Sequence, residues 1–452
     1  MKYVFIVLIF LLFYGCGSEE KTSILLESDG LISHSRISLP KNGINEQVVK
    51  AFFGDEESNR VVVVDVDHMK LLVSDLYTNH LQTHTADKVA NKPKVYVVNR
   101  GSNAIDVVNI NNYHLYKTIP LPHHPRSAEA MNKEYGLCAV SGMDKPMVSI
   151  IDTTTDRVLF TVGDDIVTYP VNGHGGKHAC GHPFWLDKDH FVLLDRGRRR
   201  ITTYRIYRDT NSSSWKVKKL NSIRTSTSVH QIIPPKGNYQ GDKNIFYATA
   251  EGSDQVYPSV VKLVLTKNGL HINDEFFLEP DGVSPSDVSI HHGDFHPFSP
   301  FIYVGMSNGT LFVVNYSQEK MQLETKILAG KGAGHTVMAK KKKLGIIINH
   351  KDRFVTIVDL KNNHKIKDIL VSELGKDLVG SVSIQAHPKY YISTDGRFLY
   401  AFLTYEGIMY KLDLDTLEVA SKLYIGGHLE QGSFVVPSSA FVKVTINNIV
   451  HY

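Results

Sequence analysis

The feature that most constrains the fold of this chain is a histidine that recurs before a strand-like segment. In each copy a turn leads to the histidine, and a stretch rich in β-branched and aromatic residues follows it. The mean spacing is roughly 49 residues, which falls among the periods of propeller and kelch repeats. The copies, of which the last is the weakest, start at His84, His124, His182, His230, His292, His335, His387 and His428. A residue that recurs at one position of a radial repeat should form a ring.

Further strand-like segments lie between the histidines, most clearly in residues 94–121 and 136–163. Their alternation of apolar and polar residues, with turns at Gly, Asn or Asp, indicates strands joined by hairpins. We therefore predict an all-β chain that forms a single β-propeller over residues 46–452, with eight four-stranded blades whose innermost strands follow the histidines. Seven blades with an irregular cap are the alternative. The strand that closes the ring is expected from residues 433–446 or from residues 31–39.

The N-terminus has the pattern of a secretion signal. Lys2 precedes an apolar run that is too short to span a bilayer, and the run ends at Gly15-Cys16, which resembles a bacterial lipobox. We expect residues 1–15 to be a signal peptide, Cys16 to carry lipid, and residues 16–45 to form a polar tether. An ordinary cleaved signal with an unrelated cysteine is the alternative. Lipidation predicts a protein anchored to a membrane of the bacterial cell envelope, facing the periplasm or the cell exterior.

The composition narrows the classes of partner. Hydrophobic residues make up 42% of the chain and charged residues 21%, as in an ordinary globular protein. A formal net charge of +4 is too small to indicate a nucleic-acid partner. No nucleophile elbow, phosphate-binding loop or zincin motif is present, so no motif predicts an enzyme. Export would place Cys138 and Cys180 in an oxidising compartment, where they could form a disulfide.

Histidine is the residue in excess, with 22 copies in the chain. Neutral imidazole is the commonest metal-ligating side chain and suits zinc and copper. Histidines at the start of the innermost strands would surround one mouth of the propeller's central channel. We therefore predict a metal site there. The alternative is that these histidines are turn residues. The candidate ligands are His84, His124, His182, His230, His292, His335 and His387, with His123, His178, Cys180 and Asp294 beside them. His230 ranks lower because a Pro-rich insertion follows it, and His428 because its register is unclear.

The unit at residues 94–121 resembles the repeat of the YVTN family of bacterial β-propellers, and the resemblance extends over nearly the whole mature chain. Two metal-handling relatives are similar in histidine placement. One is the propeller domain of nitrous oxide reductase, whose histidine ring holds a copper–sulfide cluster; His123-His124 resembles its paired histidines. The other is the periplasmic zinc metallochaperone propeller, which passes zinc to the solute-binding protein of an importer.

The sequence departs from both relatives. It continues for only about 24 residues after His428, so we expect no cupredoxin domain to supply electrons as in nitrous oxide reductase. The His-rich tail of the zinc chaperone is not matched either, since the tether holds only His34.

Three functional hypotheses follow. The first is an exported, lipid-anchored propeller that stores or delivers zinc or copper, with a periplasmic solute-binding protein or another metal-accepting protein as partner. The second is a copper-dependent redox enzyme that uses the same histidine ring. The third is a metal-free interaction scaffold. If the histidines are ligands, metal affinity should fall as the pH drops through the region near 6.5, where imidazole takes up a proton.

Overall fold

The computed structural model describes residues 48–167, 169–170, 176, 178–209, 211–212, 214–235, 241–385 and 390–436. The chain separates into two compact units, Met1–Asn45 and Glu46–Tyr452, and the described residues all belong to the second. The predicted signal peptide, Cys16, the tether and His387 lie outside the described residues. No helix in the described part is long and apolar enough to cross a membrane.

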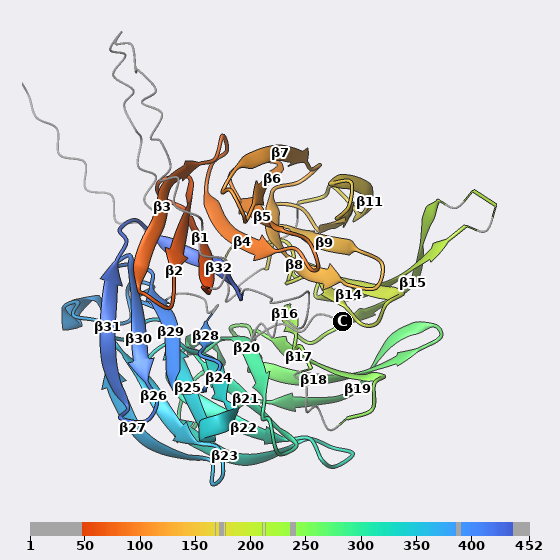
Figure 1. Ribbon diagram of the computed structural model, residues 1–452. Helices are drawn as coiled ribbons and strands as arrows, with labels where there is room; N and C mark the ends of the chain where they lie inside the picture. Colours follow the sequence, from red (N-terminus) through yellow and green to blue (C-terminus); the bar gives the residue numbers. More distant parts are fainter. Residues whose placement is uncertain are drawn as a thin grey trace, which may run out of the picture. The chain divides into compact units, whose positions relative to one another are not determined.

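The described strands form eight groups of four, in which neighbouring strands are antiparallel (Figure 1). The group at the chain ends contains β32 (Leu429–Val435), β1 (Lys50–Asp55), β2 (Arg60–Asp65) and β3 (Lys70–Tyr77). The next three are β4 (Thr83–Lys88), β5 (Lys94–Asn99), β6 (Ala104–Asn109) and β7 (Leu115–Pro120); β8 (Pro125–Asn132), β9 (Leu137–Gly142), β10 (Met147–Asp152) and β11 (Arg157–Gly163); and β12 (Phe184–Trp185), β13 (His190–Asp195), β14 (Arg200–Arg208) and β15 (Trp215–Arg224).

The remaining four groups continue the same order along the chain. They are β16 (Val229–Ile232), β17 (Ile245–Ala250), β18 (Ser259–Thr266) and β19 (Gly269–Phe277); β20 (Ile290–Phe295), β21 (Phe301–Met306), β22 (Thr310–Asn315) and β23 (Gln322–Leu328); β24 (Ala333–Ala339), β25 (Leu344–Asn349), β26 (Phe354–Asp359) and β27 (His364–Leu370); and β28 (Tyr391–Ile392), β29 (Phe398–Leu403), β30 (Ile408–Asp413) and β31 (Glu418–Tyr424). Three short 3-10 helices lie in loops, at Pro285–Asp287, Lys340–Lys342 and Lys376–Leu378.

Burial differs between the strands of a group, and the pattern of apolar and polar residues differs in the same way. The second and third strands are apolar runs covered on both faces, such as the buried valines of β2. The fourth strand alternates exposed and half-buried residues, as in β3 and β27. Lysines such as Lys216, Lys218 and Lys365 stand on these outer strands, where charge discourages edge-to-edge pairing with other chains.

The hydrophobic core is divided into clusters that each lie between two consecutive groups of strands. Eight such clusters in the described residues link every group to the next, including the last group to the first. In the cluster that joins last to first, the rings of Phe53 and Phe402 are 3.9 Å apart between centroids. The groups are therefore the blades of a closed ring, and the predicted all-β propeller class is confirmed.

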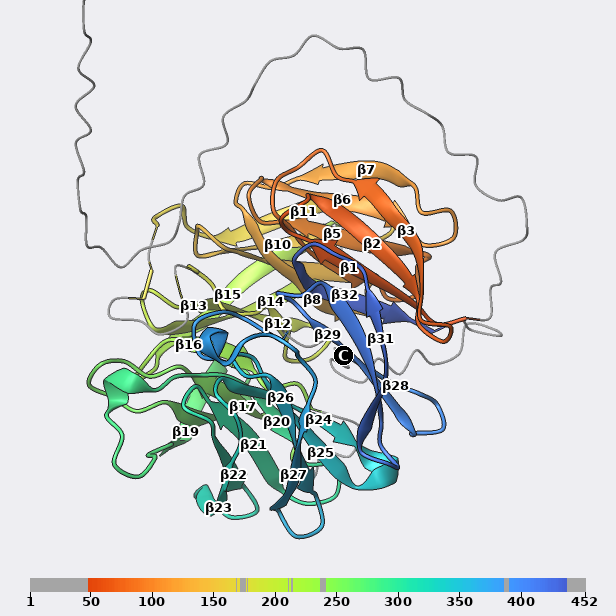
Figure 2. The same ribbon diagram turned by 90° about the vertical axis from the view of Figure 1, so that its left-hand side faces the viewer.

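The ring closes where the two ends of the described chain meet. β32 pairs antiparallel with β1, so that Phe52 lies opposite Ser433, and the two strands lie side by side in Figures 1 and 2. A parallel pairing of Gln431 with Thr85 also connects β32 to β4. A Cβ added to Gly432 would lie 1.9 Å from the Phe52 carbonyl oxygen, so this close approach requires glycine. The C-terminal closing strand predicted from the sequence is thereby confirmed, although it begins at Leu429; residues 31–39 and 437–452 lie outside the described part.

Candidate metal centre

A β-bulge occurs at the same place in several innermost strands. In β4, Thr83 pairs with Asn99 and Thr85 with Val98, so His84 is an extra residue in its strand. Comparable shifts fall at His230 in β16, at His291 and His292 in β20, and at His335 in β24. A bulge re-aims the side chain of the extra residue. In these four blades the recurring histidine is therefore a bulge residue on the innermost strand.

Two blades carry other residues at this bulge. In β8 the extra residue is Arg126, and His124 lies two positions earlier. In β32 the register shift spans Glu430 and Gln431, and His428 comes just before the strand. The bulge position is thus a ring of side chains, but the ring contains a guanidinium and a carboxylate as well as imidazoles.

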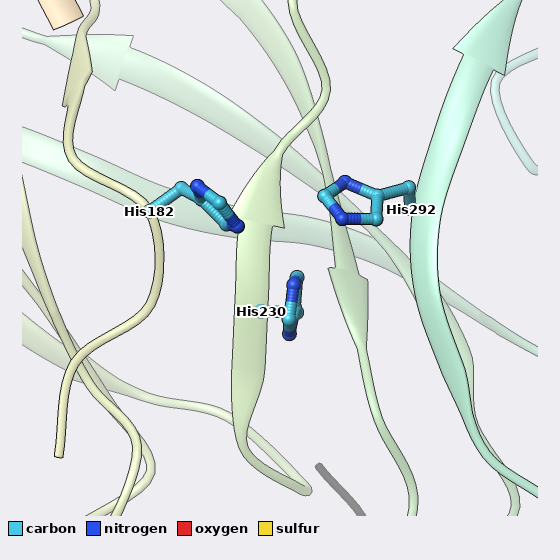
Figure 3. Close-up of side chains that lie close together, drawn as sticks. All are labelled: His182, His230 and His292. Atoms are coloured by element: carbon cyan, nitrogen blue, oxygen red, sulfur yellow. The ribbon is translucent and has the colours of Figure 1, made fainter. Parts of the chain in front are cut away.

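Three buried histidines converge in this ring (Figure 3). His182 precedes β12, His230 lies in β16 and His292 in β20, so consecutive blades supply them. Their ring centroids are 5.1 Å apart for His182 and His230, 5.3 Å for His182 and His292, and 4.8 Å for His230 and His292. One nitrogen from each ring lies within 4.8 Å of the others. We refer to these three residues as the histidine triad.

Each ring of the triad is oriented by a hydrogen bond at its Nδ1. Its Nδ1 faces a side-chain oxygen that can only accept a hydrogen bond, so Nδ1 donates the hydrogen and Nε2 keeps its lone pair. Neighbouring blades or adjacent strands supply the oxygens. The pairs are His182 with Glu129 Oε1, His230 with Glu251 Oε1 at 2.6 Å, and His292 with Gln231 Oε1 at 2.7 Å.

The electrostatic surroundings keep two rings of the triad, His182 and His230, neutral. Burial lowers the pKa of His182 despite the nearby Glu129 carboxylate, and burial together with the charge of Arg126 lowers the pKa of His230. Arg126 Nη2 lies 3.3 Å from His230 Nε2 and can only donate, which agrees with a lone pair on that nitrogen. Burial and the neighbouring arginines lower the pKa of Arg126 to about 9. Arg126 therefore remains a cation at neutral pH.

More imidazoles extend from the triad. Ring centroids are 4.9 Å apart for His230 and His291, 3.8 Å for His292 and His335, and 6.0 Å for His335 and His350. A Cβ added to Gly334 would lie 2.3 Å from the His350 ring, so glycine makes room for that histidine. His291 and His350 were not among the residues predicted as ligands. Together with the triad, these residues form a continuous group of histidines from four consecutive blades.

Asp294, predicted to complete or orient the metal site, lies near His335, which was predicted as a ligand. Asp294 Oδ2 lies 3.8 Å from His335 Nδ1 and accepts a 2.7 Å hydrogen bond from the backbone of Thr336. Asp294 thereby joins β20 to β24 and places a carboxylate near the next blade's histidine.

A second set of polar residues lies around the centre and was not predicted from the sequence. Each member directly follows the second strand of its blade, where the chain turns at the same end as the bulges. Arg196 and Glu251 are examples: they form a fully buried ion pair with Nη2 and Oε2 2.6 Å apart, and Glu251 also holds His230. The set comprises Glu56, Arg100, Arg196, Glu251 and His350. Its signal was present in the sequence as a charged residue or histidine that directly follows the second strand in these five blades.

The other predicted ligands have separate environments. His123 is buried, with Nε2 2.9 Å from Ser149 Oγ and Nδ1 3.1 Å from the His124 carbonyl oxygen. Burial lowers the pKa of His123 to about 4. The Cys180 thiol donates to the carbonyl oxygens of Lys145 and Met147, both 3.4 Å away. These side chains are satisfied by the backbone or by a hydroxyl.

The remaining predicted ligands also lie outside the triad. Burial lowers the pKa of His178, whose carbonyl oxygen accepts a hydrogen bond from Arg196. His84 belongs to a different cluster, with Glu56 and Glu430. Cys138 and Cys180 are both buried free thiols.

Comparisons with known proteins give the fold but no family. No protein-family model and no curated protein matches the chain. The solved structures it resembles include apo AztD from Citrobacter koseri, with a TM-score of 0.53, 10% identity, and coverage of 87% of this chain and 99% of that one. Dihydro-heme d1 dehydrogenase NirN in complex with DHE has a TM-score of 0.61, 12% identity, and coverage of 90% and 78%. The periplasmic gluconolactonase PpgL of Pseudomonas aeruginosa has a TM-score of 0.52, 11% identity, and coverage of 72% and 97%. At these identities the likeness establishes one point, that the chain folds as a β-propeller.

Proposed function

We propose that this chain binds a transition-metal ion, zinc or copper, through Nε2 of the histidine triad, and that it stores or delivers that ion. The observation that carries the proposal is the common orientation of the three rings, each with Nδ1 against an acceptor. Metal-ligating histidines almost always donate their second N–H to a carboxylate or carbonyl, which orients the ring and raises its basicity. The triad has this arrangement before any ion binds.

The dimensions of the triad also suit such an ion. A tetrahedral zinc with Zn–N bonds of about 2.0–2.1 Å places its ligand nitrogens roughly 3.3 Å apart. One nitrogen from each ring already lies within 4.8 Å of the others, and the rings would move closer together around an ion. Three imidazoles without a protein carboxylate favour zinc or copper over magnesium or calcium, which prefer oxygen ligands. Three ligands also leave one position of a tetrahedral ion open for exchange.

The histidines next to the triad support delivery. His291, His335 and His350 lie within ring contact of the triad or of one another, so an ion could pass between imidazoles by ligand exchange. The resemblance of the repeat to the periplasmic zinc metallochaperone favours the same role, with a solute-binding protein or another metal-accepting protein as recipient. We further propose that lipid on Cys16 holds the protein at the cell envelope, where such a recipient would be found.

Metal analysis of a double variant tests the proposal. His182→Ala combined with His292→Ala should remove one tightly bound equivalent of zinc or copper while circular dichroism and Tm stay close to wild type. The matched control is His114→Ala with His271→Ala, because both of these histidines are exposed on outer strands or turns. Equal metal content in the two double variants would show that the triad does not bind the ion.

The anchor has its own test. Cys16→Ser should release the protein from the membrane fraction, while metal content stays unchanged. Continued membrane association of the variant would contradict lipidation at this residue.

A copper-dependent redox enzyme is the second candidate, and Arg126 is the observation that favours it. Its guanidinium stands 3.3 Å from Nε2 of His230, so it would lie close to an ion bound by the triad once that nitrogen turns to the metal. A buried cation there suits an anionic substrate on the metal. Visible absorption of the loaded protein separates bound Cu²⁺ from bound Zn²⁺, because Zn²⁺ is d¹⁰ and colourless, and a zinc-only protein would rule out the redox function. A protein that takes up no metal at all would instead be an interaction scaffold.

A further inference from the structure

A second cluster of ligand-type side chains lies at the seam where the ring closes. Glu56 directly follows β1, His84 is the bulge residue of β4, and Glu430 lies at the bulge of β32. One ligand atom from each residue lies within 4.8 Å of the others. We call these three residues the seam cluster. Its members come from the beginning and the end of the propeller, so the cluster exists only when the ring is closed.

His84 provides an independent indication of a ligand. Its side chain is 3% exposed, and neither ring nitrogen makes a hydrogen bond to another described residue. The Glu56 carboxylate is 3.7 Å from Nδ1, beyond hydrogen-bonding distance. A buried polar group without a hydrogen bond costs free energy unless something else binds it. An ion between His84 and the carboxylates would satisfy the imidazole.

The backbone at the seam brings His84 close. A Cβ added to Gly54 would lie 2.5 Å from the carbonyl carbon of His84, so β1 can approach β4 only because residue 54 is glycine. This approach sets Glu56, two residues further along, beside the imidazole of His84.

The charges around the seam differ from those of the triad. Glu430 Oε1 is 2.7 Å from His428 Nε2, so His428 donates a hydrogen bond to the Glu430 carboxylate. Burial lowers the pKa of Arg100, while the charges of Glu56 and Glu430 oppose that change. The alternative role of both carboxylates is therefore to neutralise Arg100 and His428.

We propose that the seam cluster is a second divalent-cation site, with one imidazole and two carboxylate ligands, that stabilises the closed ring. One nitrogen and two oxygen donors suit zinc or manganese, and the two negative charges attract a cation more strongly than the neutral triad does. An ion bound there would join β1, β4 and β32, and binding would stabilise only the closed form. This site is independent of the function proposed for the triad.

The test uses the full chain with His182→Ala and His292→Ala, so that the triad cannot contribute. In equilibrium dialysis against Zn²⁺, this double variant should retain one equivalent. Adding Glu430→Gln should weaken the remaining binding at least about 10-fold, because a charged ligand becomes an amide. Adding Glu57→Gln should change nothing, because Glu57 is an exposed neighbour of the same charge. Glu56→Gln, which leaves the bond between His428 and Glu430 intact, should weaken binding like Glu430→Gln.

A thermal measurement completes the test without altering the seam. Zn²⁺ should raise the Tm of the His182→Ala, His292→Ala variant, because the ion binds the folded form alone. Absence of bound Zn²⁺ in this variant, an unchanged Tm, or equal binding by the Glu430→Gln and Glu57→Gln variants would overturn the proposal. The carboxylates would then serve Arg100 and His428 only.

Discussion

The histidine triad and the seam cluster occupy equivalent places in the propeller but differ in how they are held. Each uses residues at or near the bulge of an innermost strand. The triad consists of rings whose Nδ1 atoms face acceptors, whereas no described residue offers His84 at the seam an acceptor within hydrogen-bonding distance. Consecutive blades form the triad, while the seam joins the two ends of the propeller. The comparison teaches that one backbone position can support an organised neutral site and a charged site that depends on closure.

Removal of the closing strand should have the largest effect. Deleting residues from Ser433 onward removes the half of β32 that pairs with Phe52 and takes Phe434 from the core of the first and last blades. The deletion should expose the edge of β1 and leave a cavity in the hydrophobic cluster between the first and last blades. We therefore expect loss of the cooperative thermal transition. Circular dichroism melting measures this. A truncated chain that melts like the full chain would show that the seam is not needed for closure.

Glu251→Ala should destabilise the region of the triad severely. It leaves Arg196 buried without its carboxylate and His230 without its acceptor. Breaking a buried pair in this way costs about 3–5 kcal/mol of unfolding free energy, as chemical denaturation would measure. At the exposed residue Glu134, the change to Ala should cost less than about 0.5 kcal/mol. Similar losses for the two variants would contradict the idea that the triad region depends on the pair of Arg196 and Glu251.

Glu129→Gln should act on the metal rather than on the fold. The amide keeps the shape of the side chain but removes the charge that orients His182 through Nδ1. We expect metal affinity to fall about 10–100-fold with little change in Tm. Chelator competition measures the affinity, and Glu134→Gln provides the control. An unchanged affinity would mean that His182 is oriented by packing alone.

Acidification should have a smaller effect. Burial lowers the pKa of His182 and His230 below 6.5, so these two rings stay neutral and the triad should keep its metal to a lower pH than free imidazole would. The expectation of release near pH 6.5 therefore moves downward. Glu430, with a pKa of about 2, keeps its charge through this range. Metal content followed by dialysis from pH 7 to 4 checks this, and release centred at or above pH 6.5 would contradict it.

The same lowered pKa values predict the pH dependence of stability without metal. The unfolded chain takes up protons on its histidines as the pH falls below 6.5, whereas buried His123 remains neutral down to about 4. The unfolded state then binds more protons, so the free energy of unfolding should decrease between pH 6.5 and about 4. Denaturation at several pH values measures this decrease. A constant free energy of unfolding across that window would contradict the burial of these rings.

Several features could be predicted from the sequence because they depend on periodicity alone. The histidine spacing and the alternation within strands indicated a propeller, the innermost position of the strands after each histidine, and a closing strand from the C-terminus. Both patterns repeat many times, so an error in one copy does not alter the conclusion. The predicted lipid anchor and His387 lie outside the described residues and stay predictions.

The composition of the site was decided by the tertiary structure. In β8 the bulge residue is Arg126, and the predicted ligand His124 lies two positions earlier, just before the strand. The spacing of histidines in the sequence is too coarse to show a difference of two positions. His230 ranked low because of the insertion after it, yet the bulge before that insertion places it at the centre of the triad. Local sequence thus determined which strands are innermost. Which side chains meet depends on contacts between blades, and residues such as Glu56 and Glu430, far apart in the chain, become neighbours only when the ring closes.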